Sequence, residues 1–85
     1  MARPVPKWLM KRYSLLWIER QSKPFDYEEA RKMLHTSPSL TSVILSELRK
    51  ADWLGVEIDP KDTRKRIYIL TDPTKAIESM AKMEK

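Results

Sequence analysis

The hydrophobic period of the chain changes near Trp53, and this change limits the folds that the chain can adopt. Before Trp53 the apolar residues recur at the three- and four-residue spacing of amphipathic helices. After it, Val56 and Ile58 alternate with acidic residues, and Ile67 and Ile69 repeat the period of two. The segment between them, DPKDTRK, is rich in turn-forming residues. The sequence therefore predicts helices followed by a β-hairpin with a charged tip.

Helix-start signals divide the rest of the chain. Asp26 and Glu29 have the spacing of a capping box. Ser37 is suited to cap a helix with Pro38 in its first turn, and a proline at residue 73 opens the last helix. We expect an extended N-terminal arm (1–6) and one domain (7–85), which contains helix 1 (7–22), helix 2 (26–35), a third helix (37–52), the hairpin (54–71) and a C-terminal helix (73–83).

The composition excludes several kinds of site. The 85 residues include no cysteine, so a disulfide framework, a thiolate zinc site and a cysteine nucleophile are absent. The single glycine, Gly55, cannot build a P-loop or a dinucleotide-binding turn. His35 is the single histidine, and no second group of catalytic or metal-binding residues accompanies it. We therefore expect neither an enzyme nor a bound metal or cofactor.

The charge favours an anionic partner. The chain has a net charge of +5 and a pI of about 9.6, as in proteins that bind nucleic acid or acidic lipid. Residues 1–23 hold six basic side chains against Glu19, and a second basic run lies at residues 64–66. The N-terminal basic group is either an arm that tracks phosphates or a solvated chain end. No secretory signal or membrane-spanning apolar run is found, so we expect a soluble cytoplasmic protein.

The third predicted helix has two unlike faces. Steps of ~100° per residue place one set of residues on a core-facing stripe and a second set opposite. The second set is unusual, because exposed helix faces usually carry long charged side chains rather than serines. The core-facing set is Leu40, Thr41, Ile44, Leu45, Leu48 and Ala51, and the opposite set is Ser39, Ser42, Val43, Ser46, Arg49 and Lys50.

The segment SELRKADWLGVEIDPKDTRKRIYILT resembles the end of the recognition helix and the wing of MarR-like and ArsR-like regulators. Leu48 matches the leucine of that pattern, Trp53-Leu54 its apolar pair, and Leu70-Thr71 the closing pair. Asp52 stands where these families usually have glycine, and the preceding turn, His35-Thr36, also lacks one. The resemblance covers residues 27–81. It implies an α+β, mostly helical winged helix-turn-helix, with a three-helix core, a hairpin wing and a C-terminal helix.

A winged helix-turn-helix places its third helix in the major groove of duplex DNA, where short side chains permit close approach. Residues 33–48 contain no lysine or arginine, so shape and phosphate contacts are expected to dominate over base readout. The alternatives are a solvated serine face and a hairpin whose charges only block strand pairing. The expected DNA-binding residues are Thr36, Ser37, Ser39, Ser42, Val43, Ser46, Arg49 and Lys50 of the helix region, and Lys61, Arg64, Lys65 and Arg66 of the wing.

These features predict a small transcriptional regulator that acts at the nucleoid. The alternatives are a protein-interaction module of a larger assembly and a sequence-independent nucleoid-associated protein. Surplus apolar residues favour a homodimer, although the same residues could instead complete a monomeric core. The expected dimer surface combines the second face of helix 1 (Trp8, Leu15, Ile18) with the C-terminal helix (Ile77, Met80, Met83).

Overall fold

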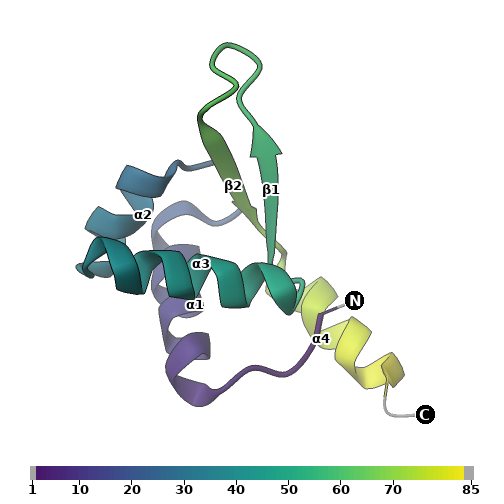
Figure 1. Cartoon of the computed structure of the whole chain (residues 1–85). Coiled ribbons are helices and arrows are strands. Elements are labelled where there is room, and N and C mark those ends of the chain that lie inside the picture. Colours follow the sequence, from purple (N-terminus) through teal and green to yellow (C-terminus); the bar gives the residue numbers. More distant parts are fainter. Residues whose placement is uncertain (1, 84–85) are drawn as a thin grey trace.

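Three helices pack around one core and a β-hairpin rises from it (Figure 1). The computed structural model describes residues 2–83, and the side chain of Met83 and residues 84–85 of the expected domain lie outside that description. This is the predicted α+β order of a winged helix-turn-helix. The elements are α1 (Lys7–Arg20), α2 (Tyr27–Leu34), α3 (Pro38–Lys50), β1 (Leu54–Ile58), β2 (Arg66–Leu70) and α4 (Pro73–Met83). None of these helices combines the length and the apolar content that crossing a membrane requires.

The first two helices end earlier than predicted. Helix α1 stops at Arg20 rather than at residue 22, because Gln21 takes a positive φ of 51° while its N–H still bonds the Trp17 carbonyl. Helix α2 stops at Leu34, since His35 takes the left-handed conformation with a φ of 54°.

Helix α2 begins at its predicted capping box. The Glu29 N–H donates to the Asp26 carboxylate at 2.9 Å, and the Asp26 N–H donates to the Glu29 carboxylate at 3.2 Å. Asp26 is therefore the N-cap, and the helix itself starts one residue later than predicted, at Tyr27. The backbone N–H groups of Asp26 and Glu29 are thus both satisfied by side chains.

Helix α3 ends at Lys50, two residues before the predicted end. Asp52 adopts a φ of 62°, and its N–H donates to the Arg49 carbonyl at 3.1 Å. The next N–H, from Trp53, donates to the Leu48 carbonyl at 2.9 Å. This pair of hydrogen bonds is a Schellman closure, in which the left-handed position usually belongs to glycine. Asp52 thus closes the helix where the MarR-like pattern has glycine.

The two strands form an antiparallel hairpin whose register runs from Leu54 opposite Leu70 to Ile58 opposite Arg66. A third segment joins the hairpin at the middle of β2. Phe25 exchanges two backbone hydrogen bonds with Tyr68, at 3.0 and 2.8 Å, and their rings stack with centroids 5.9 Å apart. Strand β2 is therefore tied to the entry of α2 as well as to β1.

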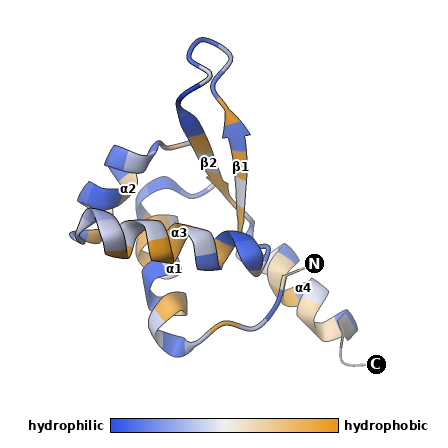
Figure 2. Cartoon of the chain, viewed as in Figure 1, coloured by the Kyte–Doolittle hydropathy of each residue, from blue (hydrophilic) through white to orange (hydrophobic). Residues whose placement is uncertain are grey.

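The core forms where the apolar stripes of α1, α2 and α3 meet the base of the hairpin. The predicted stripe of α3 is buried except for Leu40, which is 38% exposed because it lies in the first turn, at the edge of the stripe. The hairpin tip is hydrophilic throughout (Figure 2). The largest fully buried side chains are Leu9, Leu16, Phe25, Thr41, Ile44 and Leu48.

The N-terminal arm is extended, as predicted, but it is fixed to the domain. Ala2 is 3% exposed. The Arg3 N–H donates to the Ala51 carbonyl at 2.9 Å, and the Trp53 indole N–H donates to the Arg3 carbonyl at 2.6 Å. The arm consequently lies beside the carboxyl end of α3 (Figure 1).

Tyr13 connects α1 to the junction between the hairpin and α4. The side chain is 2% exposed, its hydroxyl donates to the Thr71 carbonyl, and its ring meets Trp53 edge to face with centroids 5.0 Å apart. Burial, assisted by the negative charge of Asp72, raises the pKa of Tyr13 to about 12.

The buried phenol predicts a loss of stability in strong base. An unfolded tyrosine ionises near pH 10, whereas folded Tyr13 holds its proton until about pH 12. The stabilisation is complete below pH 10 and is lost as the pH rises towards 12, by on the order of 2–3 kcal/mol in the free energy of unfolding. Urea unfolding at several pH values, for wild type and Tyr13→Phe, measures this difference. Equal losses in both proteins would contradict it.

Candidate nucleic-acid interface

Thr36 and Ser37, which are among the expected DNA-binding residues, make hydrogen bonds through their hydroxyls in the turn before α3. The Leu40 N–H donates to the Ser37 hydroxyl at 3.2 Å, which makes Ser37 the N-cap of α3. The Thr36 and Thr41 hydroxyls are 2.6 Å apart, and the Thr41 hydroxyl also donates to the Ser37 carbonyl at 2.8 Å. Thr36 and Ser37 therefore organise the helix-turn-helix turn.

The face of α3 opposite the core is exposed along its whole length, as predicted. We call Ser39, Ser42, Val43 and Ser46 the serine face. Val43 is 48% exposed at its centre. Two cations, Arg49 and Lys50, follow in the last turn, where Lys50 lies 3.7 Å from the carboxylate of Glu47. The helix thus presents short side chains first and positive charge at its carboxyl end.

Two aspartates shape the tip of the hairpin. The carboxylate of Asp59 accepts the Lys61 N–H at 2.8 Å, and that of Asp62 accepts the Arg64 N–H at 3.0 Å. The Arg64 guanidinium lies 3.6 Å from Asp62, yet its side chain is 93% exposed. Arg64 is therefore held near Asp62 at the tip while almost all of its side chain remains exposed to solvent.

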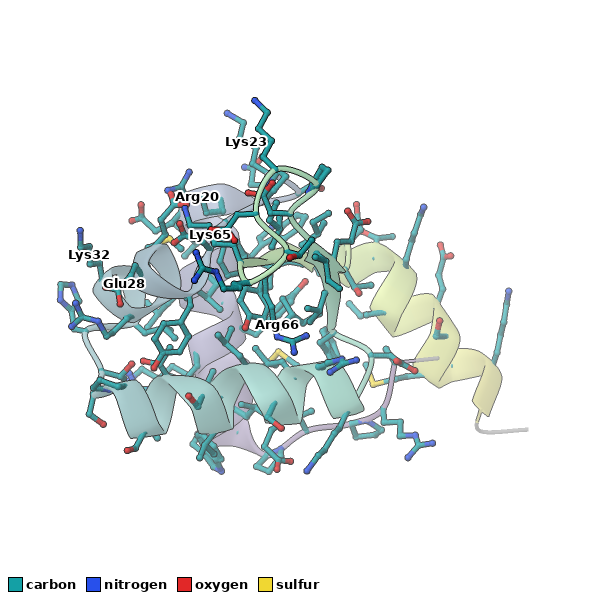
Figure 3. The ribbon with its side chains drawn as sticks, turned by 45° about the horizontal axis from the view of Figure 1, so that its top comes forward. Arg20, Lys23, Glu28, Lys32, Lys65 and Arg66 are labelled. Atoms are coloured by element: carbon teal, nitrogen blue, oxygen red, sulfur yellow. The ribbon has the colours of Figure 1, made fainter. Side chains whose placement is uncertain are left out.

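The side chains of the next two cations, Lys65 and Arg66, point in different directions. Lys65 reaches the carboxylate of Asp26, at 3.9 Å, at the N-terminus of α2. The side chain of Arg66 lies between the hairpin and α3 (Figure 3). Arg64, Lys65 and Arg66 are consecutive in the sequence, but their side chains lie at three different places. These are the hairpin tip, the N-terminus of α2 and the space between the hairpin and α3.

A groove separates α3 from β2, and we call it the α3–β2 groove. Its volume is about 190 Å³. Leu45 and Val56 supply its apolar wall. Its polar lining comes from α2, α3 and β2 and consists of Tyr27, Ser42, Ser46, Arg49, Arg66 and Tyr68.

The positive charge of this groove is not neutralised by residues 2–83. Arg20, Arg31 and Arg64 each contact a carboxylate. Among residues 2–83, no carboxylate lies within 4.0 Å of the guanidinium of Arg49 or Arg66. Both arginines are also exposed, so their charges are available to a ligand.

Tyr68 lies among these cations. Burial raises the pKa of its phenol, the nearby charges of Arg66 and Arg49 oppose that shift, and Tyr27 adds to it. Its side chain is half-buried, and its hydroxyl stays protonated as a neutral hydrogen-bond donor.

Sequence reasoning missed both tyrosines of the groove, since neither is among the expected DNA-binding residues. A signal was present for Tyr68, which stands two residues after Arg66 and so shares its face of the strand. Tyr27 directly follows the helix cap, and its hydroxyl donates to the Pro38 carbonyl at 2.6 Å across the helix-turn-helix turn. No short-range pattern indicates that contact.

In the part of the chain from 2 to 83, no three potential metal-ligating side chains lie together.

No family model matches the chain. In sequence it is 39% identical over 64 residues to the type I restriction enzyme MjaVII methylase subunit of Methanocaldococcus jannaschii. That match covers 72% of this chain and 11% of the other protein. The chain thus spans only a small part of this curated relative.

Solved structures with the same fold are MarR-like regulators. A mutant of S. aureus MepR bound to an oligodeoxyribonucleotide has a TM-score of 0.69 at 19% identity, with 93% of this chain and 57% of that chain covered. A mutant of E. coli MarR complexed with operator DNA has a TM-score of 0.67 at 19% identity, with 86% of this chain and 50% of that chain covered. A MarR-family transcriptional regulator from Streptomyces coelicolor in complex with DNA has a TM-score of 0.62 at 29% identity, with 75% of this chain and 41% of that chain covered. The predicted winged-helix fold and its likeness to MarR-like regulators are confirmed.

The capping role of Ser37 separates it from the serine face. Ser37→Ala removes the acceptor for the Leu40 N–H and should lower the free energy of unfolding by about 1 kcal/mol. Ser39→Ala changes an exposed hydroxyl that makes no hydrogen bond within residues 2–83, so it should stay within about 0.5 kcal/mol of wild type. Chemical denaturation of both variants compares them, and equal effects would refute the distinction.

Proposed function

We propose that this protein binds duplex DNA as a winged-helix transcriptional regulator. The observation that carries the proposal is the exposed serine face of α3 beside a hairpin with cations at its tip and at the adjoining end of β2. A helix without long side chains on its outer face can enter a major groove ~12 Å wide until its backbone nears the bases. The cations then meet the phosphates on either side.

Each predicted site residue takes a role in this proposal. The serine face reads the major groove, with Val43 placed for a thymine methyl group. Arg49 and Lys50 contact phosphates, and exposed Arg64 at the tip enters the minor groove or follows the backbone. Lys61, Lys65 and Arg66 add phosphate contacts from the wing, while Thr36 and Ser37 act by fixing the start of α3.

The comparisons support DNA as the ligand. Regulators with the same fold have been solved with an oligodeoxyribonucleotide or operator DNA, and the sequence relative is a subunit of a restriction enzyme. This function requires no catalytic group. It also assigns the protein to the nucleoid, in the cytoplasm.

Binding to a labelled duplex of random sequence, followed by fluorescence anisotropy, tests the proposal. About six to ten phosphate contacts would lower the affinity by ~10³–10⁵ between about 50 and 200 mM salt. Arg64→Ala/Lys65→Ala should weaken binding and flatten the salt dependence by about one unit of slope for each phosphate that the variant no longer neutralises. Lys75→Ala/Lys82→Ala removes the same charge from exposed positions on α4, which carries no expected DNA-binding residue, and serves as the control. Absence of binding at the lower salt concentration would refute duplex DNA as the ligand.

A protein-interaction module is the second candidate, because Val43 leaves an apolar side chain at the centre of the serine face. A protein interface there would depend far less steeply on salt than a DNA complex does. A nucleoid-coating protein would keep the salt dependence but would not discriminate between a selected site and random sequence. The same titration, repeated with a duplex that carries a selected site, therefore separates all three functions.

We further propose a homodimer. On α1, Trp8 is 47%, Leu15 37% and Ile18 73% exposed, and on α4 Ile77 is 60% exposed. Met80 packs partly against the core and contributes less to this surface. Two α3 helices about 34 Å apart would then read successive turns of one DNA face.

Ile18→Glu tests the dimer. A carboxylate in an apolar interface carries a desolvation penalty, so the variant should sediment as a monomer at tens of micromolar while wild type sediments as a dimer. Val43→Glu, which alters another exposed apolar residue on the serine face, should remain dimeric. A monomeric wild type under these conditions would contradict the proposal.

A further inference from the structure

The α3–β2 groove combines charged and neutral donors that the described part of the chain leaves unused. The guanidinium groups of Arg49 and Arg66 have no carboxylate partner within residues 2–83. The hydroxyls of Ser46 and Tyr68 likewise make no hydrogen bond to that part of the chain. Such a set matches an anion with several oxygens, and guanidinium forks fit phosphate best.

Two further residues of the groove shape it. The Tyr27 hydroxyl donates to the Pro38 carbonyl, and the Ser42 hydroxyl lies 3.5 Å from the Tyr27 hydroxyl. These contacts hold the α2 side of the groove in place. Its volume of about 190 Å³ exceeds the ~150 Å³ of a protein cavity that admits benzene, so a phosphate group fits.

The geometry of duplex DNA brings a phosphate to this place. A single sugar-phosphate strand separates each major groove from the neighbouring minor groove. If α3 lies in the major groove and the hairpin tip in the adjacent minor groove, that strand crosses the gap between α3 and β2. The α3–β2 groove occupies this gap (Figures 1 and 3).

We propose that the α3–β2 groove receives one phosphate group of the bound duplex, held jointly by Arg49 and Arg66 with the hydroxyls of Tyr68 and Ser46 as neutral donors. This assignment rests on the proposed function, since the duplex supplies the phosphate. It makes one phosphate bridge α3 and the wing, because Arg49 belongs to α3 and Arg66 to β2. Tyr68, which is not among the DNA-binding residues expected from the sequence, becomes a ligand-binding residue.

Inorganic phosphate tests the groove without DNA. Titration at constant ionic strength, followed by amide NMR, should give saturable shifts at Ser46, Arg49, Arg66 and Tyr68. The shifts should disappear in Arg49→Gln/Arg66→Gln and persist in Arg64→Gln, whose charge lies at the wing tip. Shifts that do not saturate, or that centre on the tip, would overturn the groove as a phosphate site.

Salt dependence of DNA binding tests whether one phosphate is shared. Each phosphate neutralised on B-DNA contributes about 0.9 to the slope of log affinity against log salt. Arg49→Gln/Arg66→Gln should therefore reduce the slope by about 0.9 in total, because both arginines hold the same phosphate. Arg64→Gln/Arg66→Gln, the control pair, should reduce it by the sum of its single variants. A reduction of about 1.8 for the groove pair would overturn sharing.

Tyr68→Phe provides the neutral comparison. It keeps the ring stacked on Phe25 and removes the hydroxyl donor, so it should weaken DNA binding roughly two- to tenfold with an unchanged salt slope. Unchanged affinity would overturn the hydroxyl as a ligand. Saturable phosphate binding by a wild type that does not bind DNA would overturn the proposed function, whereas DNA binding with additive slopes would overturn the shared phosphate.

Discussion

The corner between α3 and the hairpin is the constraint on which the rest of this structure depends. The chain must stop being a helix at Lys50 and start a strand at Leu54, and it does so through the left-handed Asp52. A left-handed residue with a side chain costs about 1 kcal/mol or more, so neighbouring contacts must favour it. The backbone of Arg3 supplies two of them, since it binds both the Ala51 carbonyl and the Trp53 indole.

This corner determines where the proposed DNA-binding groups lie. It aims β1, and through the hairpin register also β2, across the last turns of α3. Arg66 consequently faces the same groove as Arg49, although the two residues are 17 positions apart in the sequence. A small change in the backbone at Asp52 would move the wing relative to α3 and separate the two guanidinium groups. A residue that is not itself expected to bind DNA thereby governs the geometry of the proposed contact.

Local patterns predicted most of the fold, because the signals involved are local. The capping box at Asp26, the cap at Ser37 and the change of period at Trp53 each depend on neighbouring residues. The serine face followed from helical periodicity. The sequence did not predict contacts between segments that lie far apart along the chain. These are the binding of the N-terminal arm beside α3, the different directions of the Lys65 and Arg66 side chains, and the position of Tyr27 and Tyr68 in one groove. These depend on how α2, α3 and β2 pack together, which no short segment encodes.

The bridge between Phe25 and Tyr68 affects how the wing would move. A lone two-stranded hairpin can bend along its whole length, but here a third backbone segment grips β2 at mid-strand. Bending is thereby confined to the part of the hairpin beyond Tyr68, chiefly residues 59–65. The conformational entropy lost when the wing meets a ligand falls on this short tip rather than on the whole hairpin. The hairpin would therefore meet a ligand with a rigid strand pair and a short flexible tip.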